Sequence, residues 1–181
     1  HGVWGSGAEH QLEEAGRKLE IPVYNIPYHQ KLLGEQSAAY MGLADIHQYH
    51  PSKDAFGEAD LVLMVGGRLD NQMNFGNAPL FPQSTELICI NGSHEEVDFN
   101  RAADMTLLSD PGAFFDALIS LGESARSGRD EGWFALNRQR RIDWIAGMQA
   151  DVDAEAAAPE FGGRIHPLHL ALDVHQAMQD D

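Results

Sequence analysis

The apolar positions of this 181-residue chain follow two kinds of pattern. Over residues 8–19 they recur at helical spacing and share one face of a helix: Leu12, Ala15, Gly16 and Leu19. Continuous apolar runs follow at residues 59–67, 87–92 and 105–108. A run without alternation is typical of a strand buried on both faces, as in a parallel sheet. The pattern therefore predicts a helix and then three such strands.

Turn and cap residues between these segments support the assignment. Paired glycines end the first run, and Asn91-Gly92 ends the second. Asp110 followed by Pro111 predicts the start of a helix that runs to residue 121. Residues 21–26 are β-like, residues 27–45 are expected to be loop with one helical turn, and Ser52 is expected to cap another helix. The succession of strand, glycine turn and helix predicts an α/β fold with a doubly wound, Rossmann-like parallel sheet.

The last third of the chain is more polar. A linker at residues 122–132 precedes a long helix from residue 133 to about 158, and a second linker leads to a final helix that opens at residue 165. We therefore expect three parts: a nucleotide-fold domain over 1–121, a linker with a long helix over 122–164, and the first helix of a following domain over 165–181.

Composition excludes several classes of function. The net charge of −16 disfavours nucleic acid and anionic membranes as partners, because both select basic surfaces. No apolar stretch approaches the roughly 20 residues of a membrane span, and the first residues do not read as a signal peptide. The single cysteine, Cys89, excludes an intrachain disulfide and a thiolate zinc cluster, which favours a cytoplasmic setting. His47 and His50 have metal-compatible spacing but no evident third ligand, so we assign no metal site there.

Four stretches, in order, resemble the central domain of the thiamine-diphosphate (ThDP) enzymes related to acetolactate synthase, oxalyl-CoA decarboxylase, 2-hydroxyacyl-CoA lyase and benzaldehyde lyase. They are GAEHQLEEAGRKLEIPVYNIP at 7–27, ADLVLMVGGRLDNQMNFG at 59–76, ELICINGSHEEVDFN at 86–100 and IHPLHLALDVHQAM at 165–178. Each motif alone is weak, and their order and spacing give the resemblance its strength.

The resemblance implies a parallel six-stranded sheet and places both ends of the chain. On this alignment the chain begins one strand late and stops one strand before the metal motif of the next domain. The first strand of the family's sheet lies in its middle. Losing four or five buried aliphatic side chains removes about 10 kcal/mol, comparable to the whole stability of a domain. We therefore expect the isolated chain not to fold autonomously.

The resemblance also implies the chemistry of the parent enzyme. Its relatives use ThDP and Mg²⁺ to act on 2-keto acids or 2-hydroxyacyl-CoA as lyases or transferases, and the cofactor serves as electron sink. The activating glutamate and the metal ligands of the family lie in other domains, so no catalytic or metal-binding residue is assigned here. The expected partners are the remaining domains of the parent chain and further copies of it, in a homo-oligomer.

A second site is implied by the resemblance, because this domain binds FAD or ADP in some relatives. Glycine turns approach phosphates, and polar residues after later strands take ribose hydroxyls. The matching positions are Gly66, Gly67, Arg68, Asp70, Asn91, Ser93 and Asp110. Asn91, Ser93 and Ser109 replace residues that the family commonly has as Asp, Asp and Gly, which weakens the expected site. Arg68 is equally suited to a phosphate or to a salt bridge with Asp70 or another acid.

Two other functions fit the same pattern. A stand-alone Rossmann-type module that binds FAD, ADP or NAD without ThDP chemistry has the same strands and turns. A deacetylase-like NAD domain belongs to the same fold class, but it needs a catalytic histidine and usually a zinc module, which the single cysteine disfavours.

Overall fold

The computed structural model describes residues 2–26, 32–79, 81–98, 100–122, 132–156 and 165–177. The chain forms two compact units, His1–Arg141 and Ile142–Asp181. The predicted three-part division has boundaries beside residues 123–131 and 157–164, which lie outside the described part, so it stays a prediction.

Two helices open the first unit: α1 (Gly2–Ser6) and α2 (Glu9–Leu19). The predicted apolar face of α2 is confirmed, because its four buried residues are Leu12, Ala15, Gly16 and Leu19. Helix α1 was not predicted, since two glycines in five residues disfavour a helix. Tertiary contacts hold it instead: the Gly2 N–H donates to Gly66 O at 3.0 Å.

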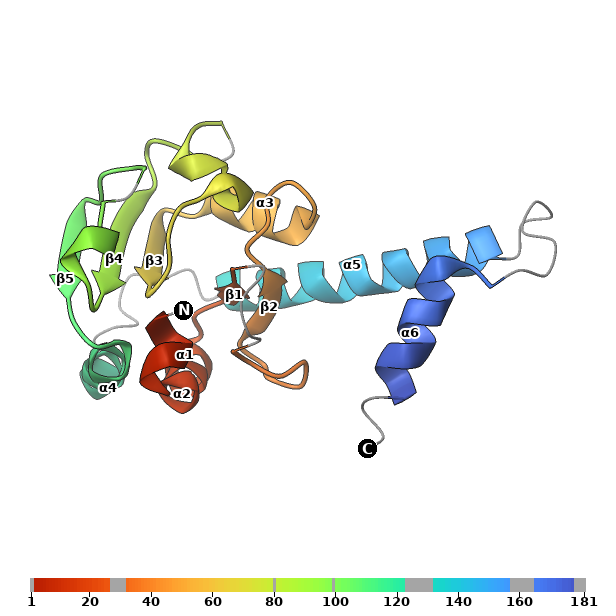
Figure 1. Ribbon diagram of the computed structural model, residues 1–181, viewed down its shortest axis with the longest axis horizontal. Coiled ribbons are helices and arrows are strands. Elements are labelled where there is room, and N and C mark those ends of the chain that lie inside the picture. Colours follow the sequence, from red (N-terminus) through yellow and green to blue (C-terminus); the bar gives the residue numbers. More distant parts are fainter. Residues whose placement is uncertain are drawn as a thin grey trace. The chain divides into compact units, whose positions relative to one another are not determined.

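The three predicted apolar runs form a parallel ladder in the order β3 (Leu61–Val65), β4 (Glu86–Asn91) and β5 (Met105–Leu108). A second, two-stranded parallel sheet joins β1 (Val23–Asn25) to β2 (Tyr40–Leu43) (Figure 1). The α/β class with parallel strands is confirmed. The described residues form two small sheets and not one Rossmann-like sheet.

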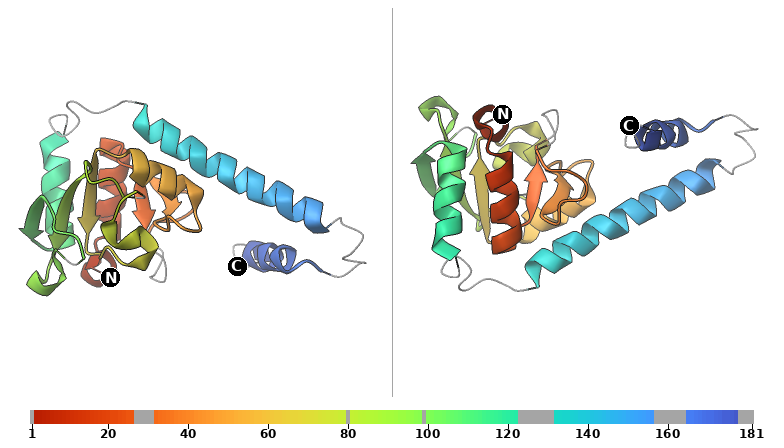
Figure 2. Two further views of the ribbon diagram at one scale, coloured as in Figure 1. Left: turned by 90° about the horizontal axis from the view of Figure 1, so that it is seen from above. Right: turned by 90° about the horizontal axis from the view of Figure 1, so that it is seen from below.

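Both sheets contribute side chains to the same two hydrophobic clusters. Tyr24 of β1 and Ile26, the residue just after that strand, pack with Val62 and Met64 of β3 in one cluster. On the other side, Val23 of β1 and Val65 of β3 pack against the second cluster, which contains residues of α2 and α4 (Pro111–Leu121). Figure 2 shows α2 and α4 on one side of the strands. The two sheets therefore lie between the same two apolar layers.

Of the two predicted helix caps, Asp110 is confirmed and Ser52 is wrong. Asp110 caps α4 as expected, and its Oδ1 accepts from the Ala113 N–H at 3.1 Å. Ser52 is not a cap, because α3 (His50–Glu58) begins two residues earlier with Tyr49 at the N-cap position. The Ser52 hydroxyl is buried and donates to Tyr49 O at 2.8 Å. Its side chain therefore satisfies a carbonyl and not the free N–H groups of the first turn.

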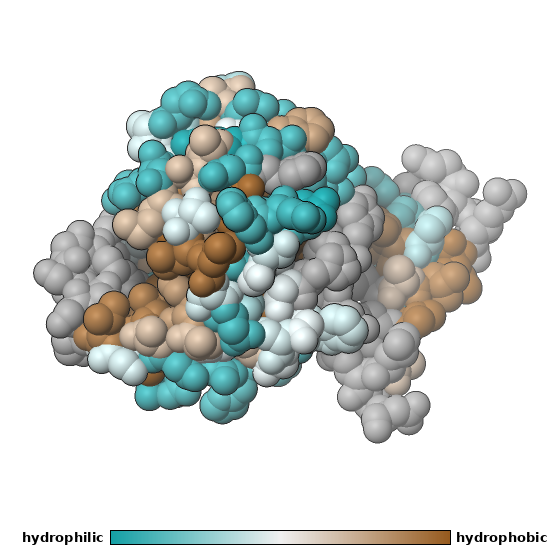
Figure 3. All heavy atoms as spheres, turned by 60° about the vertical axis from the view of Figure 1, so that its left-hand side comes forward, coloured by the Kyte–Doolittle hydropathy of each residue, from teal (hydrophilic) through white to brown (hydrophobic). Residues whose placement is uncertain are grey.

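The expected loop over residues 27–45 contains a strand that sequence reasoning missed. Within β2, Gly42 has φ +110°, and a Cβ there would lie 2.5 Å from the Tyr49 ring. A glycine in a four-residue strand hides the β signal, and only the packing of Tyr49 explains it. Strand β5 also departs from expectation: all four of its residues are exposed, because it ends the ladder. Figure 3 brings this side of the unit forward and shows hydrophobic residues at its surface.

Helix α5 (Trp133–Ala156) is shared between the units. Its first turns belong to the first unit, where the Tyr24 hydroxyl donates to Asn137 Oδ1 at 2.8 Å and Arg140 pairs with Glu58. In the second unit, α6 (Pro167–Ala177) follows, and His166 Nε2 lies 2.9 Å from Glu155 Oε2 of α5. In the described part of the chain no helix is long and apolar enough to cross a membrane.

Candidate functional site

The carboxyl ends of β3, β4 and β5 lie side by side, which brings several of the predicted site residues together. The Gly66 N–H donates to Ile90 O at 2.8 Å, and the Ser109 N–H donates to Asn91 O at 3.0 Å. Residues that follow parallel strands meet at one edge of a sheet, where α/β proteins commonly bind ligands. Gly66, Asn91 and Asp110 therefore belong to the same edge.

The two predicted glycines after β3 are explained by contacts within the protein. Gly66 has φ +61°, and a Cβ there would lie 2.6 Å from the Cα of Gly2. A Cβ on Gly67 would lie 2.5 Å from Cδ1 of Ile26. By contrast, the nearest atom to a Cβ on Gly92 is Ser109 O at 4.0 Å. The turn after β4 is therefore the more open one, and Asn91 and Ser93 of this turn were predicted as site residues but Gly92 was not.

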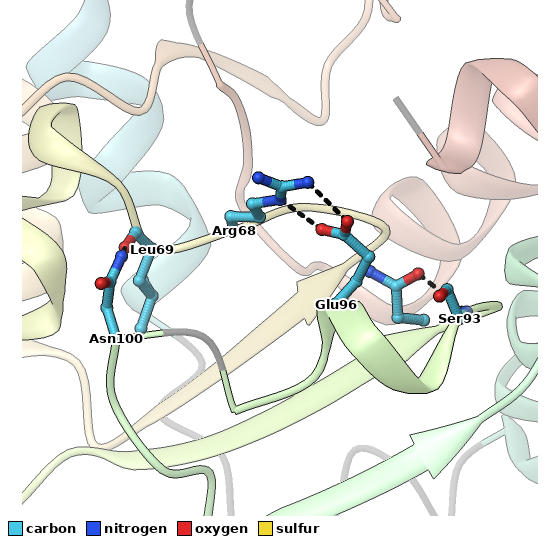
Figure 4. A network of polar contacts seen from close by, with 6 residues as sticks. Arg68, Leu69, Ser93, Glu96 and Asn100 are labelled. Atoms are coloured by element: carbon cyan, nitrogen blue, oxygen red, sulfur yellow. Dashed lines mark hydrogen bonds and ion pairs between the residues drawn. The ribbon is translucent and has the colours of Figure 1, made fainter.

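Of the two roles predicted for Arg68, a phosphate contact or a salt bridge to an acidic residue, the structure shows the salt bridge. Its partner is Glu96. Two guanidinium nitrogens, Nε and one Nη, donate to the two carboxylate oxygens (Figure 4). This hydrogen bonding with Glu96 raises the pKa of Arg68 above its ordinary value, so the guanidinium stays charged. The Arg68 side chain is nevertheless 50% exposed. Solvent, and hence a dissolved anion, reaches it.

Asp70 shapes the turn that follows. Its side chain accepts from the Gln72 N–H at 3.2 Å, and its carbonyl accepts from the Met73 and Phe75 N–H groups. It thereby caps the 3-10 turn Asn71–Gly76. A local role of this kind accounts for its place after the strand.

The polar residues after β4 form one connected turn. Asn91 Oδ1 accepts from the Ser93 N–H at 3.2 Å, and Ser93 O accepts from the Glu96 N–H at 3.2 Å. The short 3-10 helix His94–Glu96 thus starts directly behind Asn91 and Ser93. Sequence reasoning selected Asn91 and Ser93 and missed Glu96, since nothing local indicates that Glu96 folds back onto Arg68.

Within the part of the chain that the structure describes, the buried side chain of Asn25 has no partner for either of its polar atoms. Asn25, the last residue of β1, is 4% exposed, and neither its Oδ1 nor its Nδ2 makes a hydrogen bond. An unsatisfied buried amide costs about 1–3 kcal/mol, so such groups in folded proteins normally have partners. Sequence reasoning missed this residue too, because its burial depends on packing.

Metal ligation and thiol chemistry find no support in the described residues. They include no group of three or more histidine, cysteine, aspartate or glutamate side chains placed to hold a metal ion. His47 Nε2 lies 3.0 Å from Asn71 O, which suits a surface contact. Cys89 is buried and unpaired by any disulfide, and burial raises the pKa of its thiol above the ordinary value.

Comparison with known proteins adds a family match. The family described as "Thiamine pyrophosphate enzyme, central domain" matches residues 1–118. The acetolactate synthase large subunit of Cyanidium caldarium is 24% identical over 126 residues, which cover 70% of this chain and 21% of that protein. The 2-hydroxyacyl-CoA lyase of Arabidopsis thaliana is 26% identical over 102 residues, which cover 55% of this chain and 17% of that protein. The matches thus span about a fifth of each relative's length.

Proposed function

This chain belongs to the central-domain family of thiamine pyrophosphate enzymes, and we propose that it is the central domain of a larger ThDP-dependent lyase or transferase acting on 2-keto acids or 2-hydroxyacyl-CoA. The observation that carries the proposal is the family match over 1–118, which includes the parallel strands β3, β4 and β5. The names of the two relatives support the substrate class. When bound to the parent enzyme, ThDP with Mg²⁺ supplies the electron sink, and this chain supplies scaffold.

The scaffold role includes a place for one more strand. We propose that a parallel strand from elsewhere in the full-length protein lies between β1 and β3 and joins the two sheets into one. Two observations support this. Each of these strands has a single strand partner among the described residues, although side chains of both pack in the same two clusters. The unpartnered amide of Asn25 also lies at the end of β1, where a neighbouring strand offers backbone N–H and C=O groups.

We further propose that the edge formed by the ends of β3, β4 and β5 binds the ADP-containing part of FAD or ADP itself. The open turn at Gly92 and the charged Arg68 suit a diphosphate, and Asn91, Ser93 and Asp110 suit ribose hydroxyls. Gly66 and Gly67 shape the turn after β3, and Asp70 caps the turn beyond it. In the parent enzyme we expect a homo-oligomer, for which the exposed apolar residues of β5 offer a surface.

Two titrations of the full-length protein test these proposals. In the first, ThDP and Mg²⁺ are added and turnover is measured with a panel of 2-keto acids and 2-hydroxyacyl-CoA compounds. Failure to bind ThDP overturns the assignment, and binding of ADP alone points instead to a nucleotide-binding module. In the second, ADP and FAD affinities are measured for the wild type, for Ser93→Ala and for Lys53→Ala, an exposed lysine on α3 that serves as control. Equal affinities of all three proteins contradict the proposed nucleotide site.

A further inference from the structure

Glu96 lies where an anion bound by Arg68 would lie. Both of its carboxylate oxygens accept hydrogen bonds from the Arg68 guanidinium, in the two-pronged arrangement that arginine also uses for phosphate (Figure 4). Glu96 occupies the edge formed by Nε and one Nη, so a phosphate that binds at this edge has to displace it. At that edge the two ligands compete for the same nitrogens.

The position of Glu96 is set by the turn that contains the candidate ribose contacts. The Glu96 N–H donates to Ser93 O at 3.2 Å, and the Ser93 N–H donates to Asn91 Oδ1 at 3.2 Å. On the other side, Asn100 Nδ2 donates to Leu69 O at 2.6 Å and ties the chain after Glu96 to the residue after Arg68. The pair thus spans two loops that are held near each other by further bonds.

The ion pair is placed so that an anion can displace it. The side chains of Arg68 and Glu96 are 50% and 30% exposed. Ion pairs with this access to water and salt contribute little to stability, whereas a diphosphate brings more charge and more acceptor oxygens. Opening the pair exposes Arg68 without disturbing a buried group.

We infer that Glu96 is a residue of the nucleotide site: its carboxylate occupies Arg68 when the site is empty and is displaced by the phosphate of the ligand. This inference rests on the proposed nucleotide site. It adds to that site a carboxylate of the protein that competes with the bound phosphate. Competition lowers the apparent affinity by the fraction of molecules in which Arg68 is free.

Pyrophosphate binding to the full-length protein, measured by calorimetry at low salt, tests the inference. We expect Glu96→Gln to bind pyrophosphate about two- to fivefold more tightly than the wild type, the factor that corresponds to losing an exposed ion pair. Glu95→Gln is the matched control, because it removes the same charge from an exposed side chain of the same turn. We also expect the gain of Glu96→Gln to disappear in the Arg68→Ala background. Thermal melts verify that each variant is folded.

A larger gain for Glu96→Gln than for Glu95→Gln, lost without Arg68, supports the inference. Equal gains for the two variants, a gain that persists in Arg68→Ala, or no pyrophosphate binding by any variant overturns it. ADP and FAD affinities of the wild type address the proposed function separately. Failure to bind either nucleotide, together with the expected pyrophosphate pattern, overturns the nucleotide proposal and leaves Glu96 only as a competitor for anions that bind Arg68.

Discussion

One buried hydrogen bond, which Asn137→Leu removes, helps to attach the first turns of α5 to the small sheet. Asn137 is 0% exposed, its Oδ1 accepts from the Tyr24 hydroxyl at 2.8 Å, and its Nδ2 donates to Trp133 O at 2.9 Å. Leucine has the same branched shape and the same number of heavy atoms, so no large cavity forms. The Tyr24 hydroxyl, however, loses its acceptor, and leaving such a group unsatisfied costs about 1–3 kcal/mol.

We therefore expect Asn137→Leu to destabilise the docking of α5 by about 2 kcal/mol. Tyr24→Phe leaves Asn137 Oδ1 without its donor and is expected to cost about 1–2 kcal/mol. The double variant replaces both partners by apolar groups and is expected to cost less than the sum of the two. Coupling of this sign is the signature of a direct bond.

Hydrogen exchange of the full-length protein measures this cost locally. At about 2 kcal/mol, amides of residues 133–141 exchange roughly 30-fold faster in Asn137→Leu than in the wild type. Arg138→Ala, at an exposed position of the same helix, is the control and is expected to exchange at the wild-type rate. Additive effects of the two single variants, or unchanged exchange in Asn137→Leu, refute the reasoning.

Three further predictions concern pH, backbone conformation and the proposed strand. Burial raises the pKa of Tyr49 from 10 to about 12, so folding favours the neutral phenol. The resulting stability is complete below pH 10 and is lost as the pH rises toward 12. Alkaline unfolding followed by phenolate absorbance measures this loss, and a stability that does not change between pH 10 and pH 12 contradicts the prediction. Gly42→Ala places a Cβ at φ +110° against the Tyr49 ring and is expected to lower the free energy of unfolding by more than about 2 kcal/mol. Gly57→Ala, in open space within α3, is expected to raise it by up to about 1 kcal/mol. Equal shifts of the denaturant midpoint in the two variants count against this prediction. Asn25→Leu is expected to destabilise the full-length protein by about 1–3 kcal/mol, because the added strand pairs the amide there. An unchanged or increased stability, measured by denaturant unfolding, argues against the strand.

Elements with a strong local signal were predicted almost to the residue. The Asp110-Pro111 pair combines a side chain that caps the first turn with a residue whose φ is already helical, so α4 begins where expected. The apolar face of α2 follows directly from helical periodicity. Strand β2 and helix α1 were missed because their glycines lack a local preference for strand or helix. The contacts that hold them come from residues distant in the sequence.

The candidate site divides along the same line. The turns that follow β3, β4 and β5 were found from glycine, asparagine and aspartate after apolar runs, and the parallel ladder puts the three turns at one edge. Gly66 and Gly67 gave the clearest turn signal in the sequence. In the structure, the close approach of α1 and of Ile26 leaves no room for a Cβ at these two positions. Close packing and phosphate binding both require glycine, so the sequence alone does not distinguish them.

By itself, the sequence determined the family, the helices and strands with clear periodicity, and the turns that follow β3, β4 and β5. Only the tertiary structure decided which groups in these turns are engaged. Arg68 is followed closely by Asp70 in the sequence, yet its partner is Glu96, 28 positions away. Asn25 is buried without a partner although its neighbours along the chain give no sign of it. Such pairings and burials depend on distances between segments, which hydrophobic periodicity and turn chemistry do not specify.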